Sequence, residues 1–586
     1  IYYGADNTGK GADRMLQHYG SSRLGTITLT DIIYPGTSPV GSTLWNNEHA
    51  FHSSNLNRLS KTAQLHYSLT YNHDIQKQES YSQTTYLLPG SNFRVVSEDI
   101  SSHLTTNNSF VRLSYENNAQ RNYLSNTLDL SGQWRDANGA VVSNTKEMQQ
   151  HAFNRNIGVS NYTRWVHRTE GGNGVEMTSY NSAQTNAQSL TVCGGLDARQ
   201  DIDLTRVSTV NEFSLIKDLR KHRWSIVPTA ALKLNYVGMK PLLQSTISPD
   251  NGDMHYLRAG VNASATLKYV NNDFRLSFLL PLGLTHTQIK DETHRTQLCF
   301  TPLFNLQWKI NDSWTIASGG SYDVQPTSWP QLISTYIMSN YRTTSRYLPS
   351  ISDSHIGSVS SKLSFKDIMN SLFVYIQGKA SRSWSDVIYG TTIDNDARTI
   401  MQAEYMPHHD DSYSTTGNVS KGFDWKKARI DITANYSHHY GSILRQAVKT
   451  DYHSNNFSFN VNTSADILQN FRISYDCSYA FSRSVSGEYA HKIRTLEQSL
   501  NLNLSLIRKS LLMNITARHT HNSGLQEKTD YAFLNCSLTY RTKRKIEFIL
   551  EGDNIFNTHT FISRSDTQLT QYFEIYQLRP RSIMLT

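Results

Sequence analysis

Apolar and polar residues alternate with unusual regularity between Tyr531 and Asn557. Leu534, Cys536, Leu538 and Tyr540 take every second position, and the alternation resumes from Ile546 to Asp553 after a short basic segment. Successive side chains of a β-strand point to opposite faces of the sheet. The pattern therefore predicts two antiparallel strands that share one apolar face and one polar face.

The same unit recurs along most of the chain. Tight turns between the arms are expected at Asn117–Gln120, Glu170–Gly174, Lys217–Arg223, Asn271–Asp273 and Asn311–Asp312, and near Asp367, Trp425, Ile467, Arg508 and Lys543. Arms of about 10 to 14 residues, about 22 or 23 in number, are typical of the largest plugged transporter barrels. We therefore expect an all-β fold: a transmembrane antiparallel up-and-down β-barrel of about 22 strands, with short periplasmic turns and long extracellular loops.

Aromatic residues collect near the predicted short turns, as a membrane-interface girdle requires. They are Tyr115, Trp224, Tyr269, Phe274, Trp308, Trp314, Phe365, Trp425, Phe471 and Tyr540. The alternative is packing at the ends of strands in a soluble sheet. Pro228, Pro281 and Pro302 fall inside arms and each removes a ladder hydrogen bond, so we expect local bulges there.

Two stretches lack sustained alternation. Residues 1–47 and 72–107 are polar, and we interpret both as long loops. Between them, His49 to Tyr71 predicts a hairpin. The chain also begins in loop-like sequence, without a visible signal peptide, and ends inside a strand pattern. We therefore expect residues 1–586 to be the barrel portion of a longer protein.

Composition agrees with a barrel that is polar inside and apolar outside. Hydrophobic residues make up 38% of the 586 residues, charged residues only 18%, and there are 33 Tyr. The longest apolar run, FLLPL at 278–282, is far too short for a membrane-spanning helix. The inward positions are mostly Ser, Thr, Asn, Gln, Lys and Arg, so a polar lumen is expected and the substrate cannot be identified.

The net charge of +8 gathers at predicted short turns. The basic residues are Lys217, Arg220, Lys221, Arg223, Lys421, Lys426, Lys427, Arg429, Arg508, Lys509, Arg541, Lys543, Arg544 and Lys545. They fit either a basic rim that faces anionic phospholipid headgroups of the inner leaflet or plain solvation of turn residues. Nucleic-acid binding is disfavoured because no recognition helix is visible.

No residue pattern predicts catalysis. Histidines form loose clusters that we place in loops: His49 with His52, His408-His409-Asp410-Asp411, His438 with His439, and His519 with His521. The second cluster could bind a metal, but a surface role is the simpler interpretation. Cys193, Cys299, Cys477 and Cys536 lack metal or redox spacing, and the last three are expected as small apolar strand residues. No phosphate-binding or nucleophile motif is present, and Gly171 to Gly174 is interpreted as a hairpin turn. We therefore assign no catalytic, cofactor-binding or metal site and expect no enzyme.

Several short motifs resemble one family. Asp553–Thr558 and Tyr576–Ser582 resemble the C-terminal end of TonB-dependent receptors, most of all the Bacteroidota receptor-like barrels with an N-terminal carboxypeptidase-regulatory-like domain. Tyr336–Arg342, Ser420–Asp424 and Gln76–Ser80 are similar to inner segments of the same family. The resemblance implies a 22-stranded barrel in the outer membrane of a Gram-negative bacterium, a plug inside it and uptake driven by the TonB complex. This sequence contains no plug or TonB box, and its last strand lacks the terminal aromatic residue usual in the family.

Two functions remain open. The first is a receptor and transporter that imports an unidentified nutrient, captured by long loops such as Tyr81–Asn107 and Val324–Pro349. The second is a barrel that serves as a structural or assembly partner without transport. The expected partners are outer-membrane lipid, the TonB complex through a plug domain, and a surface lipoprotein.

Overall fold

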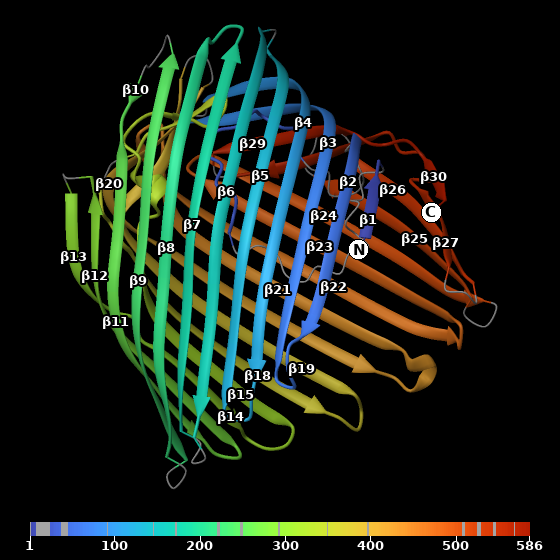
Figure 1. The fold of residues 1–586 in the computed structure, drawn as a ribbon. Coiled ribbons are helices and arrows are strands. Elements are labelled where there is room, and N and C mark those ends of the chain that lie inside the picture. The colour runs from blue at the N-terminus through green and yellow to red at the C-terminus, as the bar shows by residue number, and fades with distance from the viewer. Residues whose placement is uncertain are drawn as a thin grey trace.

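A computed structural model shows that almost the whole chain is β-strand (Figure 1). It describes residues 2–7, 24–36, 45–90, 92–144, 146–169, 173–219, 223–245, 250–290, 293–347, 350–394, 398–506, 510–523, 529–542, 546–567 and 569–585. These segments form one sheet of 30 strands, curled into a cylinder. No helix among them is long and apolar enough to cross a membrane.

The strands follow one another as a meander. Their bounds are β1 Tyr2–Asp6, β2 Trp45–Arg58, β3 Ala63–Leu88, β4 Asn92–Asn118, β5 Asn122–Ser143, β6 Lys146–Arg168, β7 Gly174–Cys193, β8 Ala198–Leu219, β9 Trp224–Ser245, β10 Asp250–Asn251, β11 Met254–Val270, β12 Phe274–Ile289, β13 Thr293–Phe300, β14 Leu303–Lys309, β15 Trp314–Gln325, β16 Ile337–Met338, β17 Thr343–Ser345, β18 Ser354–Asp367, β19 Leu372–Ile393, β20 Thr399–Gly422, β21 Arg429–Arg445, β22 Val448–Leu468, β23 Phe471–Ser486, β24 Tyr489–Leu506, β25 Leu511–Ser523, β26 Thr529–Arg541, β27 Glu547–Asp553, β28 Thr560–Asp566, β29 Thr570–Gln577 and β30 Ser582–Leu585. Two 3-10 helices, Trp329–Leu332 and Trp425–Lys427, complete the described elements.

The predicted number of strands is confirmed. We call each full-length strand of the barrel wall a stave. Of the 26 strands from β2 to β27, the short strands β10, β16 and β17 are not staves, and β13 and β14 together form one interrupted stave. The described residues therefore contain 22 staves. Each of these staves pairs antiparallel with the next. An up-and-down arrangement of this size matches the barrels that enclose a filled lumen.

The two ends of the meander meet at one end of the cylinder. β29 pairs antiparallel with β3, from Thr570↔Tyr86 to Tyr576↔Ser80. The β28–β29 hairpin also contacts β26, where the Tyr531 and Phe561 rings lie 4.7 Å apart. The Arg579 guanidinium stacks on Trp45 of β2, 4.7 Å from the ring centroid. The last segments of the chain are thereby joined to the first staves.

The strand register separates the two faces of the wall as the alternation predicted. In β11 and β12, Ala265 faces Leu280 and Leu267 faces Phe278 on the outer face. Large apolar side chains on this face are exposed throughout, for example Leu232, Val261 and Ile376. An exposed apolar surface that continues around a cylinder needs a hydrocarbon environment. The outer face is therefore the lipid face, and the inner face lines a lumen.

One end of the cylinder carries the predicted short turns. Each turn joins the last residue of one strand to the first residue of the next; these pairs are 58/63, 118/122, 168/174, 219/224, 270/274, 309/314, 367/372, 422/429, 468/471, 506/511 and 541/547. We call it the short-turn end. The predicted aromatic residues lie at this end and contact across strands, with Trp314 and Phe365 4.9 Å apart and Trp224 and Tyr269 5.2 Å apart.

The opposite end, which we call the loop end, differs from the prediction. The strands are much longer than expected, and β4 has 27 residues. Residues 72–107, predicted as a loop, are almost entirely strand within β3 and β4, and Tyr2–Asp6 is also a strand. Several connections here are as tight as the short turns, such as Gln446-Ala447. In β3 beyond Tyr71 both faces carry mostly polar residues, so alternation is lost although the ladder continues.

The predicted bulges at proline are wrong at two positions. Pro228 and Pro281 pair in register with Ala265 and Ser264. Pro302 lies in the break between β13 and β14, opposite Leu280; beside it Thr301 N donates to Pro281 O at 3.2 Å, and the register is the same on both sides of the break. The bulges recorded among the described strands are at Ser385/Val387 and Asp466/Leu468 instead. A proline is tolerated without a bulge where its nitrogen faces a gap.

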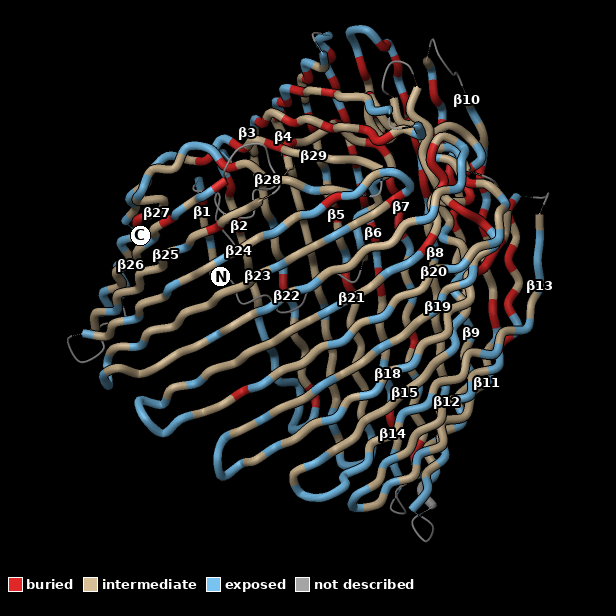
Figure 2. The backbone as a smooth tube through the Cα atoms, turned by 180° about the vertical axis from the view of Figure 1, so that it is seen from behind, coloured by how far each residue is buried: buried red, intermediate tan, exposed pale blue. Residues whose placement is uncertain are grey.

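The buried core lies inside the cylinder, toward the loop end (Figure 2). Two apolar clusters form there. One contains Ile100, Val141, Leu190 and Met338, and the other contains Ile202, Val237, Met239 and Ile337. The expectation of a uniformly polar lumen is therefore wrong at this end, because two chain segments fold into the lumen and cover the wall.

Candidate functional site: the occupied lumen

The first segment inside the lumen is the connection between β15 and β18, residues 326–353, which we call the inner loop. Its 3-10 helix starts with Pro330 in the first turn and places Leu332 against the wall. Leu332, Ile333 and Ile337 are almost fully buried against residues of β8, β9 and β11. The predicted capture loop Val324–Pro349 is thus a loop, but one that packs inward; Leu348 and Pro349 lie outside the described residues.

A turn at Asn340 fixes the tip of the inner loop. The Asn340 Oδ1 atom accepts hydrogen bonds from the backbone N–H groups of Arg342 and Thr343, at 3.0 and 2.8 Å. Asparagine caps turns in this way because its short carboxamide reaches the backbone two residues on. Residues 343–345 then pair in parallel with 399–401 of β20. The loop is held to the wall at both sides.

The second segment, residues 24–36, crosses the inner wall of β5 to β8, and we call it the strap. It has no regular secondary structure. The inner loop contacts it directly: Asp31 N donates to Ser339 O at 2.8 Å, and Thr30 Oγ1 donates to Met338 O at 2.6 Å. At its end, Gly36 N donates to the buried Glu574 carboxylate of β29 at 2.7 Å.

A ladder of inward carboxamides lies under the strap and, at Gln200, under Met338 of the inner loop, and we call it the amide ladder. Its members are Gln150, Asn154 and Asn156 of β6, Gln184, Asn186 and Gln188 of β7, and Gln200 of β8. All seven are buried. They also bond to each other, with Gln184 Nε2 donating to Asn156 Oδ1 at 2.6 Å and Asn186 Nδ2 to Asn154 Oδ1 at 2.8 Å. Buried amides need such partners to offset lost hydration.

Two charged contacts anchor the segments. Asp31 of the strap pairs with Arg135 of β5 at 2.8 Å and accepts from the Tyr34 hydroxyl at 2.7 Å. Burial raises the pKa of the Asp31 carboxyl above its usual range, although Arg135 opposes the rise. In the inner loop, Arg342 pairs with the buried Glu98 at 2.7 Å, and Tyr341 also donates to Glu98. Burial and the Glu98 charge raise the pKa of Tyr341, so its hydroxyl stays a donor.

A cavity of about 430 Å³ lies beside the inner loop. Arg342, Arg445, Thr84, Tyr86 and Tyr572 are among its lining residues, which come from β3, β21, β29 and the loop itself. Guanidinium and hydroxyl groups line it together, so it can hold a polar solute. The lumen therefore offers binding surface next to the two folded-in segments, rather than an open channel.

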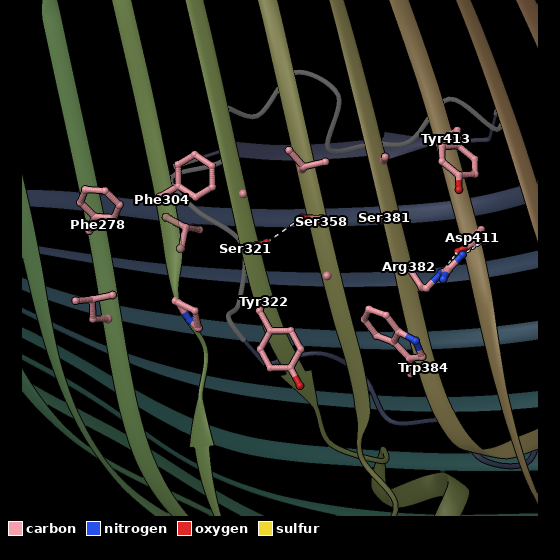
Figure 3. Close-up of a pocket in the computed structure, with 17 residues that line it drawn as sticks. Phe278, Phe304, Ser321, Tyr322, Ser358, Ser381, Arg382, Trp384, Asp411 and Tyr413 are labelled. Atoms are coloured by element: carbon pink, nitrogen blue, oxygen red, sulfur yellow. Dashed lines mark hydrogen bonds and ion pairs between the residues drawn. The ribbon is translucent and has the colours of Figure 1, made fainter.

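A second hollow, of about 660 Å³, opens on the lipid face between β12 and β20 (Figure 3). Its lining includes the small residues Gly320, Gly357 and Ala380. The aromatic side chains of Phe304, Tyr322, Trp384 and Tyr413 also line it (Figure 3). Arg382 and Asp411 pair at its edge, 2.6 Å apart. Its exposed aromatic rim belongs to the membrane-facing surface. We therefore assign this hollow to lipid contact and place the candidate site in the lumen.

The predicted histidine clusters assemble only as far as His519 and His521, which share the Asp530 carboxylate at 3.6 and 2.6 Å, and His408, which lies 3.9 Å from Asp410. All lie on strands and not in loops. Alternation places His408 and Asp410 on the inner face and His409 and Asp411 on the outer face, where Asp411 pairs with Arg382. Within the described residues, no group of three or more His, Cys, Asp or Glu side chains is arranged to hold a metal. The four cysteines are free and lie on strands, with Cys193 at the end of β7.

The basic turn residues are described only in part. Lys217, Arg223, Lys421, Lys426, Lys427, Arg429 and Arg541 lie at the short-turn end as predicted. Arg220, Lys221, Arg508, Lys509, Lys543, Arg544 and Lys545, and Gly171-Gly172 of the predicted glycine turn, lie outside the described residues. The capture loop predicted at Tyr81–Asn107 is wrong, because these residues continue β3 and β4.

Neither the strap nor the amide ladder was recognised from the sequence. The ladder does leave a signal, because Asn or Gln occupies every second position at 184, 186 and 188 and again at 154 and 156. Such a period of two in one residue type marks one face of a strand. The strap leaves none, because its partners on the wall lie more than 100 residues away in the sequence.

No family model matches the sequence, and no curated protein matches it. Among solved structures, the chain is similar to the copper transporter OprC, with a TM-score of 0.49, 10% identity and coverage of 93% of this chain and 79% of that one. It is also similar to the ferric yersiniabactin uptake receptor FyuA from Yersinia pestis, with a TM-score of 0.48, 11% identity and coverage of 94% and 81%. A third is the outer membrane transporter YddB from Escherichia coli, with a TM-score of 0.46, 10% identity and coverage of 92% and 76%. With TM-scores below 0.5, these similarities add nothing to the geometry described above.

Proposed function

We propose that the protein is an outer-membrane receptor and transporter of the TonB-dependent type, which imports a nutrient into a Gram-negative bacterium. One observation carries the proposal: a cylinder of 22 staves has an apolar outer face and a lumen occupied by its own segments. Porins of smaller strand number keep a water-filled channel, whereas barrels of this size are filled and need a gating step. Active import suits such a barrel.

The orientation follows from the two ends. The short-turn end is assigned to the periplasm and the loop end, with the inner loop and the cavity beside it, to the cell surface. Basic residues at the short-turn end then face anionic phospholipid headgroups of the inner leaflet. Outer-membrane lipid is accordingly the first partner.

The remaining partners rest on the resemblance of the short motifs. We assign residues 1–586 to the barrel portion of a longer Bacteroidota receptor, whose plug would contact the TonB complex and whose outer surface would meet a surface lipoprotein. The proposed activity is transport, and it requires no catalytic, cofactor-binding or metal-binding residue.

The test is energy-dependent uptake. A strain lacking the gene should lose growth on one nutrient among iron complexes, haem, glycans and peptides, and a strain lacking TonB should lose the same growth. Normal growth on every source, together with a changed outer-membrane protein profile, would instead support the structural or assembly role.

A further inference from the structure

The strap is bound to the amide ladder through its backbone. Gln188 Oε1 accepts hydrogen bonds from Leu29 N at 2.8 Å and Thr30 N at 3.2 Å. Gln184 Nε2 donates to Gly25 O at 2.9 Å, and Asn154 Nδ2 donates to Ile27 O at 3.3 Å. Further along, Ile33 N donates to Gln150 Oε1 at 3.3 Å. Each of these wall residues bonds a backbone N–H or C=O group, which every peptide unit has.

Carboxamides suit this task because each offers a donor and an acceptor. Gln188 uses both, since its Nε2 also donates to Ile27 O at 3.5 Å. The carbonyls of Gly25 and Ile27 and the amide of Leu29 recur at every second position, which is the spacing of one edge of an extended chain. From Gly25 to Leu29 the ladder therefore bonds the strap as a neighbouring strand edge would, and the Thr30 amide, which shares Gln188 Oε1 with Leu29, marks the end of this spacing.

Side chains of the strap also pack against the wall: Ile32 is buried in one apolar cluster and Ile27 and Leu29 pack against the other. Leu24 lies over Gly158, where an added Cβ would be 2.7 Å from Leu24 Cδ1, and Ile32 lies over Gly139, where the distance would be 3.0 Å. Glycine at these wall positions lets a chain approach closely. The ion pair between Asp31 and Arg135 and the burial of Ile32 are the contacts that depend on the strap sequence.

We propose that the amide ladder of β6, β7 and β8 is a binding track for an extended polypeptide, and that the strap occupies it as an internal competitor. The track binds peptide units through N–H and C=O groups and tolerates many side chains. That peptides are also the transported substrate rests on the proposed function. When the strap leaves, the incoming peptide takes over its hydrogen bonds with the wall.

The binding test uses the purified full chain in detergent and fluorescent peptides measured by anisotropy. One peptide has the strap sequence LGTITLTDIIYPG, and a second has the same residues scrambled. The Ile32→Asp variant undocks the strap, because a carboxylate cannot stay in the apolar cluster around Ile32. We expect both peptides to bind this variant about 10- to 100-fold more tightly than the wild type, since the competitor is removed.

Two changes isolate the backbone contacts. N-methylation of the peptide at the positions of Leu29, Thr30 and Ile33 removes three donors to the ladder and should weaken binding at least about tenfold. Methylation at the positions of Thr26 and Thr28 is the control and should have little effect. On the wall, the Gln184→Leu/Gln188→Leu pair in the Ile32→Asp background should abolish binding. Gln377→Leu, at an inward carboxamide of β19, is the matched control.

Three results would overturn the track. They are equal binding of both methylated peptides, failure of the scrambled peptide while the strap sequence binds, and displacement of peptide by an oligosaccharide at equal concentration. Circular dichroism and heat-dependent gel migration show whether Ile32→Asp is folded. If it is not, Gly139→Val takes its place, because the added methyls push Ile32 away from the wall.

Uptake separates the peptide track from the proposed transport function. Peptides that bind but are not imported would support the track and rule out peptide transport. Import of another solute without peptide binding would support the transport role and rule out the peptide track.

Discussion

At the scale of single residues, docking of the strap in the lumen depends on glycines of the wall, whose missing side chains leave room for it. Gly158 leaves room for Leu24 of the strap, and an added Cβ would meet Leu24 Cδ1 at 2.7 Å. We expect Gly158→Val to force the strap outward at a cost of about 1 to 3 kcal/mol, the usual price of overpacking. Hydrogen exchange of the strap amides, followed by mass spectrometry, should show protection reduced about tenfold or more. Gly378→Val, with open space around the new Cβ, is the control and should leave strap exchange unchanged.

The Asp31 carboxyl makes strap docking depend on pH. Its pKa is raised when docked, first by burial, with Arg135 opposing the rise. A group whose docked pKa lies above its free value takes up a proton on docking. Docking is therefore strongest below the free pKa, near 3.8, and weakens as pH rises through the higher docked value. We expect strap protection, corrected for intrinsic exchange, to fall as pH rises above the free value near 3.8 and to become flat in Asp31→Asn. An increase with pH in the wild type would contradict this sign.

At the scale of strands, the sequence contains the two-faced wall but not the length of its strands. From Val261 to Tyr269 the period of two is plain, because lipid lies on one side and the lumen on the other. In β3 the period fades after Tyr71, although the strand runs to Leu88. The alternation of apolar and polar residues reflects the environment of each strand face. It does not reflect the backbone hydrogen bonds between strands. Once both faces are polar, only pairing with β4 and β29 defines the strand, and pairing depends on distant residues.

The two faces give a direct test of the wall assignment. Leu280 lies on the lipid face and Ser277 on the lumen face of the same strand, β12. Leu280→Lys should cost roughly 2 to 4 kcal/mol if it lies near the membrane midplane, and Ser277→Lys much less. Leu502→Lys and Asn503→Lys form a second pair on β24. Urea titrations of folding into lipid bilayers measure both costs, and equal values for the two faces would argue against a membrane barrel.

The lipid face also carries a polar ring that alternation did not predict. Ser179, Asn181, Thr209 and Asn211 of β7 and β8 bond in a closed cycle, with distances of 2.6 to 2.9 Å. Apolar Met177, Val207 and Phe213 surround it. Because each polar group is satisfied inside the ring, Asn181→Val leaves its former partners unbonded in hydrocarbon. We expect a loss of about 1 to 3 kcal/mol in the same titration. Replacing all four residues by Val or Ala should restore stability to the wild-type value or above it.

At the scale of the whole molecule, the barrel was predictable and its contents were not. Turns such as Asn271–Asp273 and Asn311–Asp312 follow from local sequence, and counting them leads to 22 staves. The inner loop and the strap join residues far apart in the chain, as where Gln200 bonds the backbone of Met338 at both 2.8 and 2.9 Å. Nothing local in Leu332 or Ile337 distinguishes burial in the lumen from burial in any other core.

The filling of the lumen leads to a prediction about permeability. The inner loop is fixed by Leu332, Ile333 and Ile337 against the apolar wall around Val237 and Met239. A charge at position 337 cannot stay in this cluster without a cost of several kcal/mol, so Ile337→Asp should release the loop toward water. We expect the variant, in planar lipid bilayers, to conduct ions severalfold better than the wild type. Met369→Asp, at an exposed position of a short turn, places the same charge outside the lumen and should conduct as the wild type does. Equal conductance in all three proteins would mean that the inner loop does not obstruct the path and that the barrier to ions lies elsewhere along the lumen.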